Sequence, residues 1–408
     1  MSAVALDAPS VISPQNWTAK AMLVVALCFA INMVDGMDLN VLTFVAPKLQ
    51  SDWKITSDIM GYVFSAGLAG MAIGGTLIAP LADRFGRRKV ILLALALMSV
   101  GMVACGYVPD VRWLILVRVL VGAGIGTVLA TMAALTAEAA PVSKRTFAVG
   151  AVQAGYPFAS VFTAFIVAAL LPSWGWQKLL LGAGVCTLVM LPLAWVALPE
   201  SEQHAAVKPD RVPVGLLFSA EYRRRSILLW CATFFGLMVL YFITSWITKL
   251  SIQAGLSQTN GIYAGATYNG GAFIGTLLIS LFSLRVPLTK LVPGAMAMAA
   301  ASMLLFGTVA MPVALTLFVA LLIGVSLQGG YNGVWPLAAS LYPVECRATG
   351  IGWAIGIGRA GAFIGPLLGG YLMAANASLS SIFVIYCVPI ALCAGAVWAL
   401  RHSIPDQK

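Results

Sequence analysis

Long apolar runs and short polar or proline-marked breaks alternate along nearly the whole chain. A helix that spans a membrane needs about 20 mostly apolar residues. By this measure the pattern predicts twelve spans, at about residues 20–46, 56–80, 89–108, 112–137, 145–171, 177–198, 226–249, 258–284, 288–310, 313–341, 348–374 and 380–401. The break from Pro199 to Arg225 divides them six and six. The sequence therefore predicts an all-α polytopic membrane protein with two groups of six helices.

The composition agrees with a chain whose solvent is the bilayer. Of its 408 residues, 61% are hydrophobic and 9% are charged, whereas a soluble domain has about 45–50% apolar and about 25% charged residues. The first span carries Asp35 and Asp38 and lies behind a proline-containing tail, which is unlike a cleavable signal peptide.

The polar residues argue against several kinds of partner. The net charge is +10, but the cations do not gather with exposed aromatic residues, as binding to nucleic acid requires. The seven cysteines form no C-x-x-C pair, and the two histidines, His204 and His402, lie in polar segments. We therefore expect no nucleic-acid partner, no metal site and no cofactor.

The distribution of lysine and arginine predicts the orientation. With a cytoplasmic N-terminus, two of the 24 cations lie within spans, and five lie outside, namely Lys48, Lys54, Arg112, Lys178 and Lys249. All the others are cytoplasmic, as the positive-inside rule requires. This predicts a protein of the cytoplasmic (inner) membrane with both termini inside, and we separately expect it to function as a monomer. Its expected parts are a tail at 1–19, a bundle at 20–198, a cytoplasmic linker at 199–225, a bundle at 226–401 and a tail at 402–408.

A charged turn and an internal repeat carry a family resemblance. Between the second and third spans stands Asp83-Arg84-Phe85-Gly86-Arg87-Arg88, and Gly75-Thr76-Leu77 recurs as Gly275-Thr276-Leu277. Pro141-x-x-x-Arg145 likewise recurs as Pro343-x-x-x-Arg347. These features resemble the major facilitator superfamily, although Ala79 stands where that family usually has glycine. The resemblance implies a major facilitator fold of two parallel six-helix bundles, with a site near the midplane between them.

The same resemblance implies a cytoplasmic gate. In the family, the aspartate of the charged turn pairs with the arginine after span four and with the N-terminal end of span eleven. These contacts hold the cytoplasmic ends of the two halves together. Transferred position by position, the gate residues are Asp83, Arg84, Gly86, Arg87, Arg88, Glu138, Arg145, Glu345 and Arg347.

Four charged side chains lie within the predicted spans: Asp35, Asp38, Arg118 and Arg359. Each costs at least about 2.5–3.5 kcal/mol at the bilayer centre, so each needs a reason to be there. One interpretation is that two acids and two bases neutralise one another as buried pairs. The other is a functional site, because counting residues from the span ends puts Arg359 near the midplane and Asp38 at the depth of Arg118.

Two stretches resemble the aromatic acid:proton symporters more closely. One is Asp35-Gly36-Met37-Asp38, and the other runs from Tyr342-Pro343 to Gly358-Arg359-x-Gly361. This resemblance implies that Asp35 and Asp38 serve proton coupling, and that Arg118 and Arg359 are critical for transport. It also implies import of a benzoate-type acid, a phenylpropanoid acid or muconate. The chemistry agrees, because arginine matches a carboxylate through two parallel hydrogen bonds.

Polar and aromatic residues of the central spans complete a predicted substrate pocket, because an amide that faces lipid is costly. Besides Arg118 and Arg359, the candidates are Asn32, Gln153, Tyr156, Tyr268, Asn269, Gln328, Tyr331, Asn332 and Trp335.

The sequence leaves other functions open. A membrane-embedded enzyme is disfavoured because no catalytic constellation of histidine with serine or cysteine exists, so we expect no enzyme and no catalytic residue. A proton-independent facilitator, a symporter of another organic anion such as a sugar acid, and a transporter-like chemosensor remain. The main prediction is proton symport of an aromatic or related organic carboxylate by alternating access.

Overall fold

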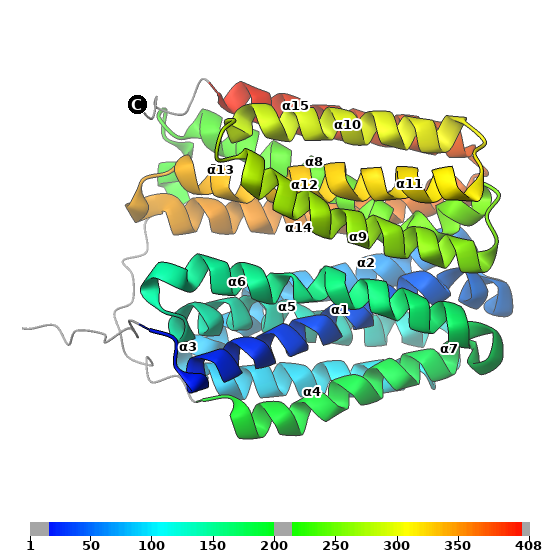
Figure 1. Ribbon diagram of the computed structural model, residues 1–408, viewed down its shortest axis with the longest axis horizontal. Coiled ribbons are helices and arrows are strands. Elements are labelled where there is room, and N and C mark those ends of the chain that lie inside the picture. The colour runs from blue at the N-terminus through cyan, green and yellow to red at the C-terminus, as the bar shows by residue number, and fades with distance from the viewer. Residues whose placement is uncertain (1–15, 200–213, 402–408) are drawn as a thin grey trace, which may run out of the picture.

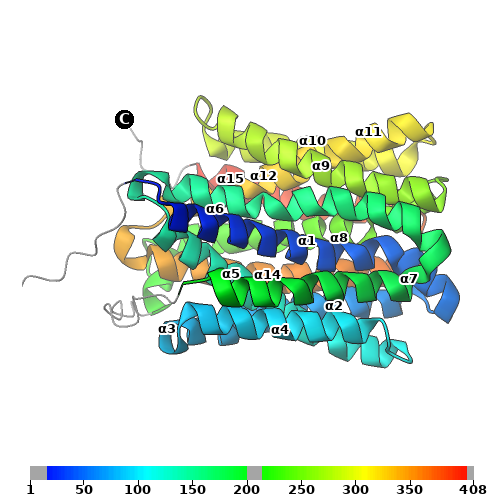
Figure 2. The ribbon, with the colours of Figure 1, turned by 60° about the horizontal axis from the view of Figure 1, so that its bottom comes forward.

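The computed structural model describes residues 16–199 and 214–401, and within these ranges it is helical with no strand. Its helices lie roughly parallel in two groups, one from each half of the chain (Figure 1). The turned view keeps α4 and α10 on opposite sides of the molecule, with α1, α8 and α14 between them (Figure 2).

The first half contains α1 to α7 and three short turns. Their bounds are α1 Ala19–Trp53, α2 Ser57–Ile73, η1 Gly74–Ile78, η2 Ala79–Leu81, α3 Ala82–Phe85, α4 Arg87–Cys105, α5 Val111–Ala139, η3 Val142–Lys144, α6 Arg145–Gln153 and α7 Gly155–Ala197. The first helix continues past Pro47 to Trp53, beyond the end near residue 46 that hydropathy predicts.

The second half repeats this plan. Its elements are η4 Val214–Phe218, α8 Arg223–Gln253, α9 Gln258–Phe282, α10 Leu288–Thr308, α11 Val313–Ile323, η5 Gly324–Gln328, α12 Gly329–Asn332, α13 Val334–Ser340, α14 Val344–Ala374 and α15 Leu379–Leu400. The π-helical turns η1 and η5 interrupt the second and tenth spans.

Among the described residues, ten helical runs are long and apolar enough to cross a membrane. One of these runs, over 147–197, contains two spans, because Gly175 has a φ of +73° and breaks the helix there. The more polar α9 is not among the ten, but its 25 residues run the full length of the bundle. The twelve predicted crossings are thereby accounted for.

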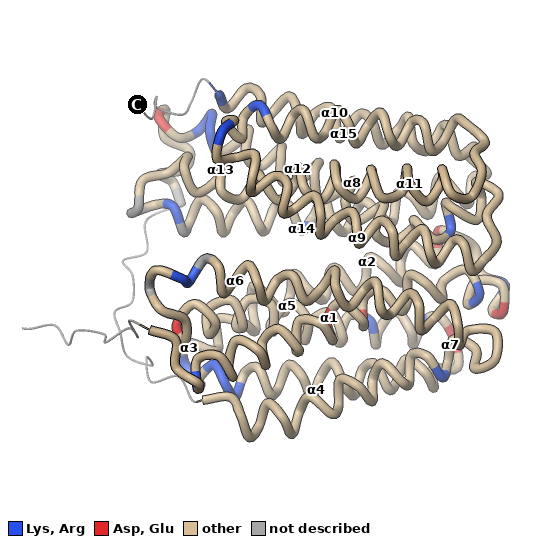
Figure 3. The backbone as a smooth tube through the Cα atoms, in the orientation of Figure 1, with Lys and Arg blue, Asp and Glu red and all other residues tan. Residues whose placement is uncertain are grey.

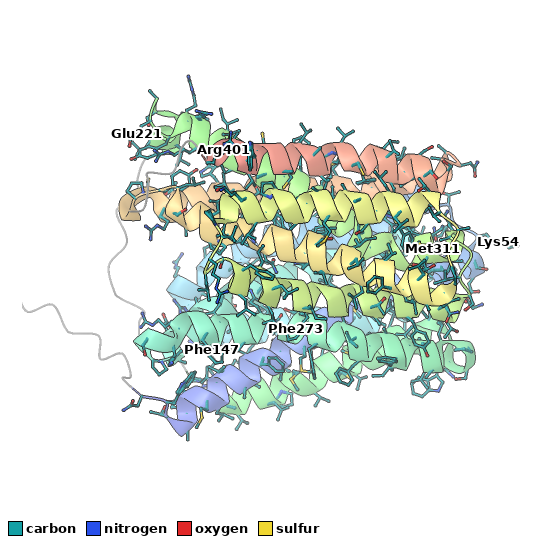
Figure 4. The ribbon with its side chains drawn as sticks, turned by 45° about the horizontal axis from the view of Figure 1, so that its top comes forward. Lys54, Phe147, Glu221, Phe273, Met311 and Arg401 are labelled. Atoms are coloured by element: carbon teal, nitrogen blue, oxygen red, sulfur yellow. The ribbon has the colours of Figure 1, made fainter. Side chains whose placement is uncertain are left out.

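The two ends of the bundle differ in charge. Figure 4 labels Glu221 and Arg401 at one end, which we call the terminal end because the chain leaves the bundle there, and Lys54 and Met311 at the other, the far end. Lys and Arg gather at the terminal end, whereas the far end mixes both signs (Figure 3).

Local sequence explains where helices begin. Thr18, Asp110, Ser257 and Ser378 each precede a helix and accept a hydrogen bond from a backbone N–H of its first turn. Such side-chain oxygens accept hydrogen bonds from the backbone N–H groups of the first turn, which have no acceptor within the helix itself.

Glycines bring helices of the same half into backbone contact. A Cβ at Gly36 of α1 would lie 2.5 Å from the carbonyl oxygen of Tyr156 of α7. In the second half, Gly361 of α14 lies against the backbone of Phe234 in α8 in the same way. Small residues at such crossings are the usual means of helix packing in membranes, so each half is a closely joined unit.

The two halves meet mainly through α2 with α14, α7 with α9, and α1 with α8. At the first crossing glycine faces glycine, since a Cβ on Gly370 would lie 3.2 Å from the Cα of Gly61. This crossing lies toward the far end. Nearer the terminal end the two sides of this crossing are exposed, at Thr76 of η1 and Pro80 of η2 and at Gly352 and Gly356 of α14.

Candidate functional site

The four intramembrane charges form no salt bridge with one another in the described part of the chain. The ion pairs described within 4.0 Å are Lys48–Asp52 at 2.7 Å and Arg87–Glu138 at 2.5 Å, both near helix ends. Asp35, Asp38 and Arg118 are nevertheless buried, with 0%, 0% and 3% of their surface exposed. Arg118 and Asp38 are neighbours that interact electrostatically, so partial neutralisation concerns this one acid and base and not two closed pairs.

Arg118 offers an open edge of its guanidinium. Its Nη1 donates to the backbone oxygen of Asp38 over 3.3 Å, while Nε and Nη2 are buried and no oxygen of the described residues accepts from them; their neighbour is the thiol of Cys105, a weak acceptor. These two nitrogens form one side of the planar fork, which is the geometry that matches a carboxylate.

A small cavity adjoins Arg118. Its walls come from both halves of the chain, and its lining includes Leu39, Thr43, Phe64, Arg118, Tyr156, Tyr241 and Thr244. Its free volume is about 30 Å³, enough for a water molecule or two but not for an aromatic ring. A larger ligand therefore requires the two halves to separate around it.

The two aspartates of α1 have different surroundings. Thr187 of α7 donates its hydroxyl to the carboxylate of Asp38, with distances of 3.0 and 3.2 Å to the two oxygens. Neither oxygen of Asp35 has a hydrogen-bond partner among the described residues. The sequence analysis missed Thr187, because a threonine inside a helix normally bonds its own helix, as this one also does to Ala183.

Asn40 is a second residue that the sequence analysis missed. Its Nδ2 donates to the Ser160 hydroxyl over 2.6 Å and lies 3.1 Å from the Tyr156 hydroxyl. Its Oδ1 accepts from Asn269 of α9 over 3.4 Å, so it joins the two halves beside the cavity. The signal was available, since Asn40 is a buried amide in the same apolar span as Asp35.

The second half contributes its own polar groups. Arg359 is half-buried, and its Nη1 donates to the Tyr241 hydroxyl over 3.3 Å. The hydroxyl groups of Thr244 and Tyr268 lie 3.1 Å apart. Because Tyr241 and Thr244 line the cavity, the structure brings Tyr156, Tyr268, Asn269 and both arginines to one region.

Other predicted pocket residues do not line this small cavity, although Tyr331 interacts electrostatically with Arg359 and Tyr241. Gln328 donates to Asn332 over 3.3 Å, and Asn332 donates to Thr276 over 2.7 Å, so these three form a cluster within the second half. Tyr331 is buried and meets Trp335 edge to face, with ring centres 5.8 Å apart.

Asn32 joins two helices of the first half rather than facing the cavity. Its Nδ2 donates to the backbone oxygen of Val152 over 2.6 Å and to Gln153 over 3.2 Å.

The predicted gate residues cluster at the terminal end. Arg87 pairs with Glu138, Arg88 donates to the backbone oxygen of Trp195, and Gly86 has φ +98°, a conformation that favours glycine. Arg84 lies over the ring of Phe85. Glu138 and Arg145 take part in further interactions, and the side chains of Asp83 and Glu345 are outside the described part.

A tyrosine next to this gate region secures the loop before α14. Arg347 donates from Nε to the backbone oxygen of Tyr342 over 3.3 Å. The Tyr342 hydroxyl donates to Ser226 over 3.0 Å. Burial raises the pKa of Tyr342 further above neutral pH.

Within the described ranges, no group of three His, Cys, Asp or Glu residues is placed to hold a metal ion. The arrangement instead offers cationic donors, hydroxyl groups and two buried carboxyl groups, which suits binding of an organic anion together with protons.

Comparisons with known proteins agree with this chemistry. Residues 28–358 match the Major Facilitator Superfamily. The 4-hydroxybenzoate transporter PcaK of Acinetobacter baylyi is 30% identical, with 96% of this chain and 94% of that protein aligned. The gallate transporter of Pseudomonas putida is 29% identical over 98% of this chain and 96% of its own. The 3-(3-hydroxy-phenyl)propionate transporter of Escherichia coli is 32% identical over 89% of each. The resemblance to aromatic acid transporters is confirmed.

Solved structures resemble the fold. The D-xylose-proton symporter superposes with a TM-score of 0.79 over 95% of this chain and 98% of its own, at 16% identity. A bacterial homolog of the human lysosomal transporter Spinster gives 0.76 over 95% and 96%, at 18% identity. At such identities the likeness concerns the fold alone, and it confirms the predicted all-α architecture.

Proposed function

The chain belongs to the major facilitator superfamily, a family of multi-pass membrane transporters and not of enzymes, and we propose that it imports an aromatic carboxylate together with protons. The observation that carries this proposal is the unpartnered Nε–Nη2 edge of Arg118, buried beside a cavity between the two halves. A buried cation with free donors is costly unless a ligand completes it. The ligand that fits this edge is a carboxylate.

The side chains that line the cavity suit an aromatic ring with polar substituents once the halves have separated to admit it. Phe64 and Leu39 supply apolar surface, and the hydroxyl groups of Tyr156, Tyr241 and Thr244 supply donors and acceptors. The three relatives above are transporters named for hydroxylated aromatic acids. Arg359 reaches the same region through Tyr241, so we assign it to substrate binding from the second half.

Of the two aspartates, we assign the proton-carrying role to Asp35. A carboxyl group that is fully buried and has no donor is far more stable when neutral, and Asp35 fits this description. Asp38 instead accepts from Thr187, and its backbone oxygen accepts from Arg118. We assign Asp38 to holding Arg118 in place. We also propose that Asp38 exchanges protons more slowly than Asp35 does.

The positive charge at the terminal end supports its assignment to the cytoplasm. On that basis we assign bundles to 20–198 and 226–401, and cytoplasmic segments to 1–19, 199–225 and 402–408, in the inner membrane of a bacterium. The hydrogen bonds described between the halves, such as that of Ser65 to Phe363, lie at the midplane or toward the far end. The conformation therefore corresponds to one closed toward the outside.

Uptake measurements test the proposal. The purified protein in liposomes with an acid exterior should accumulate 4-hydroxybenzoate, and a protonophore should abolish the accumulation but not the exchange of labelled for unlabelled acid. A competition panel of benzoates, phenylpropanoid acids, muconate and hexuronates identifies the substrate. Uptake that only equilibrates the acid across the membrane and that the protonophore does not change would indicate a facilitator, and competition by hexuronates alone would indicate a sugar-acid carrier.

A further inference from the structure

A lysine at the far end of α8 binds only neutral groups. Lys249 donates from Nζ to Oε1 of Gln50 over 2.5 Å and to the hydroxyl of Ser57 over 2.8 Å. Both acceptors belong to the first half of the chain and Lys249 to the second. Gln50 is held for this contact, because its Nε2 donates to the backbone oxygen of Thr56.

No carboxylate of the described residues lies within 4.0 Å of this half-buried cation. Its other neighbour is the ring of Trp246, whose centre is 5.7 Å from Nζ. Hydrogen bonds from neutral oxygens offset only part of the cost of removing an ammonium group from water. The nearby Lys48, in contrast, is exposed and paired with Asp52.

Lys249 lies directly above the cavity. Thr244 and Ser245, which line the cavity, precede it by four or five residues on α8, a rise of about 6–8 Å. Between them Trp246 is fully buried and meets Phe64 of the cavity wall edge to face, with ring centres 5.1 Å apart. The layers from outside to centre are therefore Lys249, the two aromatic rings, and the cavity with Arg118.

We propose that Lys249 is an outer recognition site that binds the carboxylate of the substrate before Arg118 does. When the far ends of the halves part, Gln50 and Ser57 move away with the first half and leave the ammonium group to a small organic carboxylate. The acid then passes the two aromatic rings to reach Arg118. When the halves close, the two neutral oxygens replace the carboxylate and release it inward. This inference rests on the proposed import of such acids.

The test is the uptake of labelled 4-hydroxybenzoate into proteoliposomes at low and high salt. Lys249→Gln should raise KM about tenfold with little change in kcat, the effect of losing one charge-assisted hydrogen bond. Lys249→Arg should keep KM within about threefold of wild type, because it restores the charge. Salt should raise the KM of the wild type, because it screens the attraction between the Lys249 ammonium group and the carboxylate. It should not raise the KM of Lys249→Gln, which lacks this attraction.

Two controls separate this role from a latch that only holds the halves closed. Lys48→Gln removes another outer cation and should leave KM within about twofold of wild type, as for an exposed pair. Gln50→Ala with Ser57→Ala removes the closing contacts but keeps the cation, and should leave KM unchanged or lower it. The proposal is overturned if Lys249→Gln keeps the KM of the wild type, or if the double variant reproduces its rise. A wild type that transports none of the carboxylates would overturn the proposed function as well.

Discussion

Replacing Arg118 by lysine tests the assignment on which the proposed function depends. Lysine keeps the positive charge but replaces a rigid planar fork by a single ammonium group. The Nε–Nη2 edge that lies free beside the cavity is lost. The contact of Nη1 with the backbone oxygen of Asp38 also has no counterpart of the same geometry.

The expected loss follows from the bonds at this edge. A hydrogen bond to a charged group is worth about 1.5–3 kcal/mol, and a carboxylate on the fork makes two of them. Lysine retains one at best, so the affinity should fall by one such bond, which corresponds to about 10- to 150-fold in Kd. The mutation leaves the net charge unchanged, so long-range attraction of the anion does not contribute to the difference.

The measurement is the Kd of 4-hydroxybenzoate for the purified protein in nanodiscs, by calorimetry or by quenching of tryptophan fluorescence. Thermal unfolding of both proteins shows whether the variant is folded. Lys48→Arg, a charge-conserving change at an exposed position, serves as the matched control and should leave Kd unchanged. A folded Arg118→Lys protein with the Kd of the wild type would refute the reasoning, since the open edge would then have no ligand.

Three further predictions concern other residues of the site and of the helix seams. Asp35→Asn should abolish proton-driven accumulation while counterflow exchange continues, and Asp38→Asn should reduce both. Uphill uptake at the wild-type rate in both variants would contradict the coupling assignment. Arg359→Lys should weaken binding in the same assay, and an unchanged Kd would give Arg359 a structural role in α14. Gly36→Ala should lose about 1–3 kcal/mol of unfolding free energy, because its Cβ meets the Tyr156 backbone. Gly352→Ala, where nothing lies within 4 Å, should unfold like the wild type.

The span pattern was predictable because the bilayer imposes it. A fixed hydrocarbon thickness and the cost of unsatisfied backbone groups force long apolar helices, so length and hydropathy were enough. The exceptions have physical reasons. The helix α1 extends to Trp53, because backbone hydrogen bonds continue a helix beyond the part that contacts lipid. The break within α7 depends on the positive φ of Gly175.

The site was predictable only in part, because sequence indicates which residues are costly in a membrane but not which face of a helix they occupy. Arg118 and Tyr156 were selected by cost, and both line the cavity. The same rule selected Gln328 and Asn332, which instead bond each other and Thr276. Lys249 was taken as a marker of the outer surface, and its burial against Gln50 depends on how the halves meet.

The crossing of α2 and α14 has a consequence for how the halves move. Helices usually interlock through ridges and grooves of side chains, and these fix their angle. Gly61 and Gly370 present neither where they face each other. The angle between α2 and α14 can therefore change at this point without any interlocked side chains having to separate, so one half can rotate against the other. Substitution of the side chains that select the substrate leaves this glycine crossing unchanged, so the same motion of the two halves can serve the transport of many different acids.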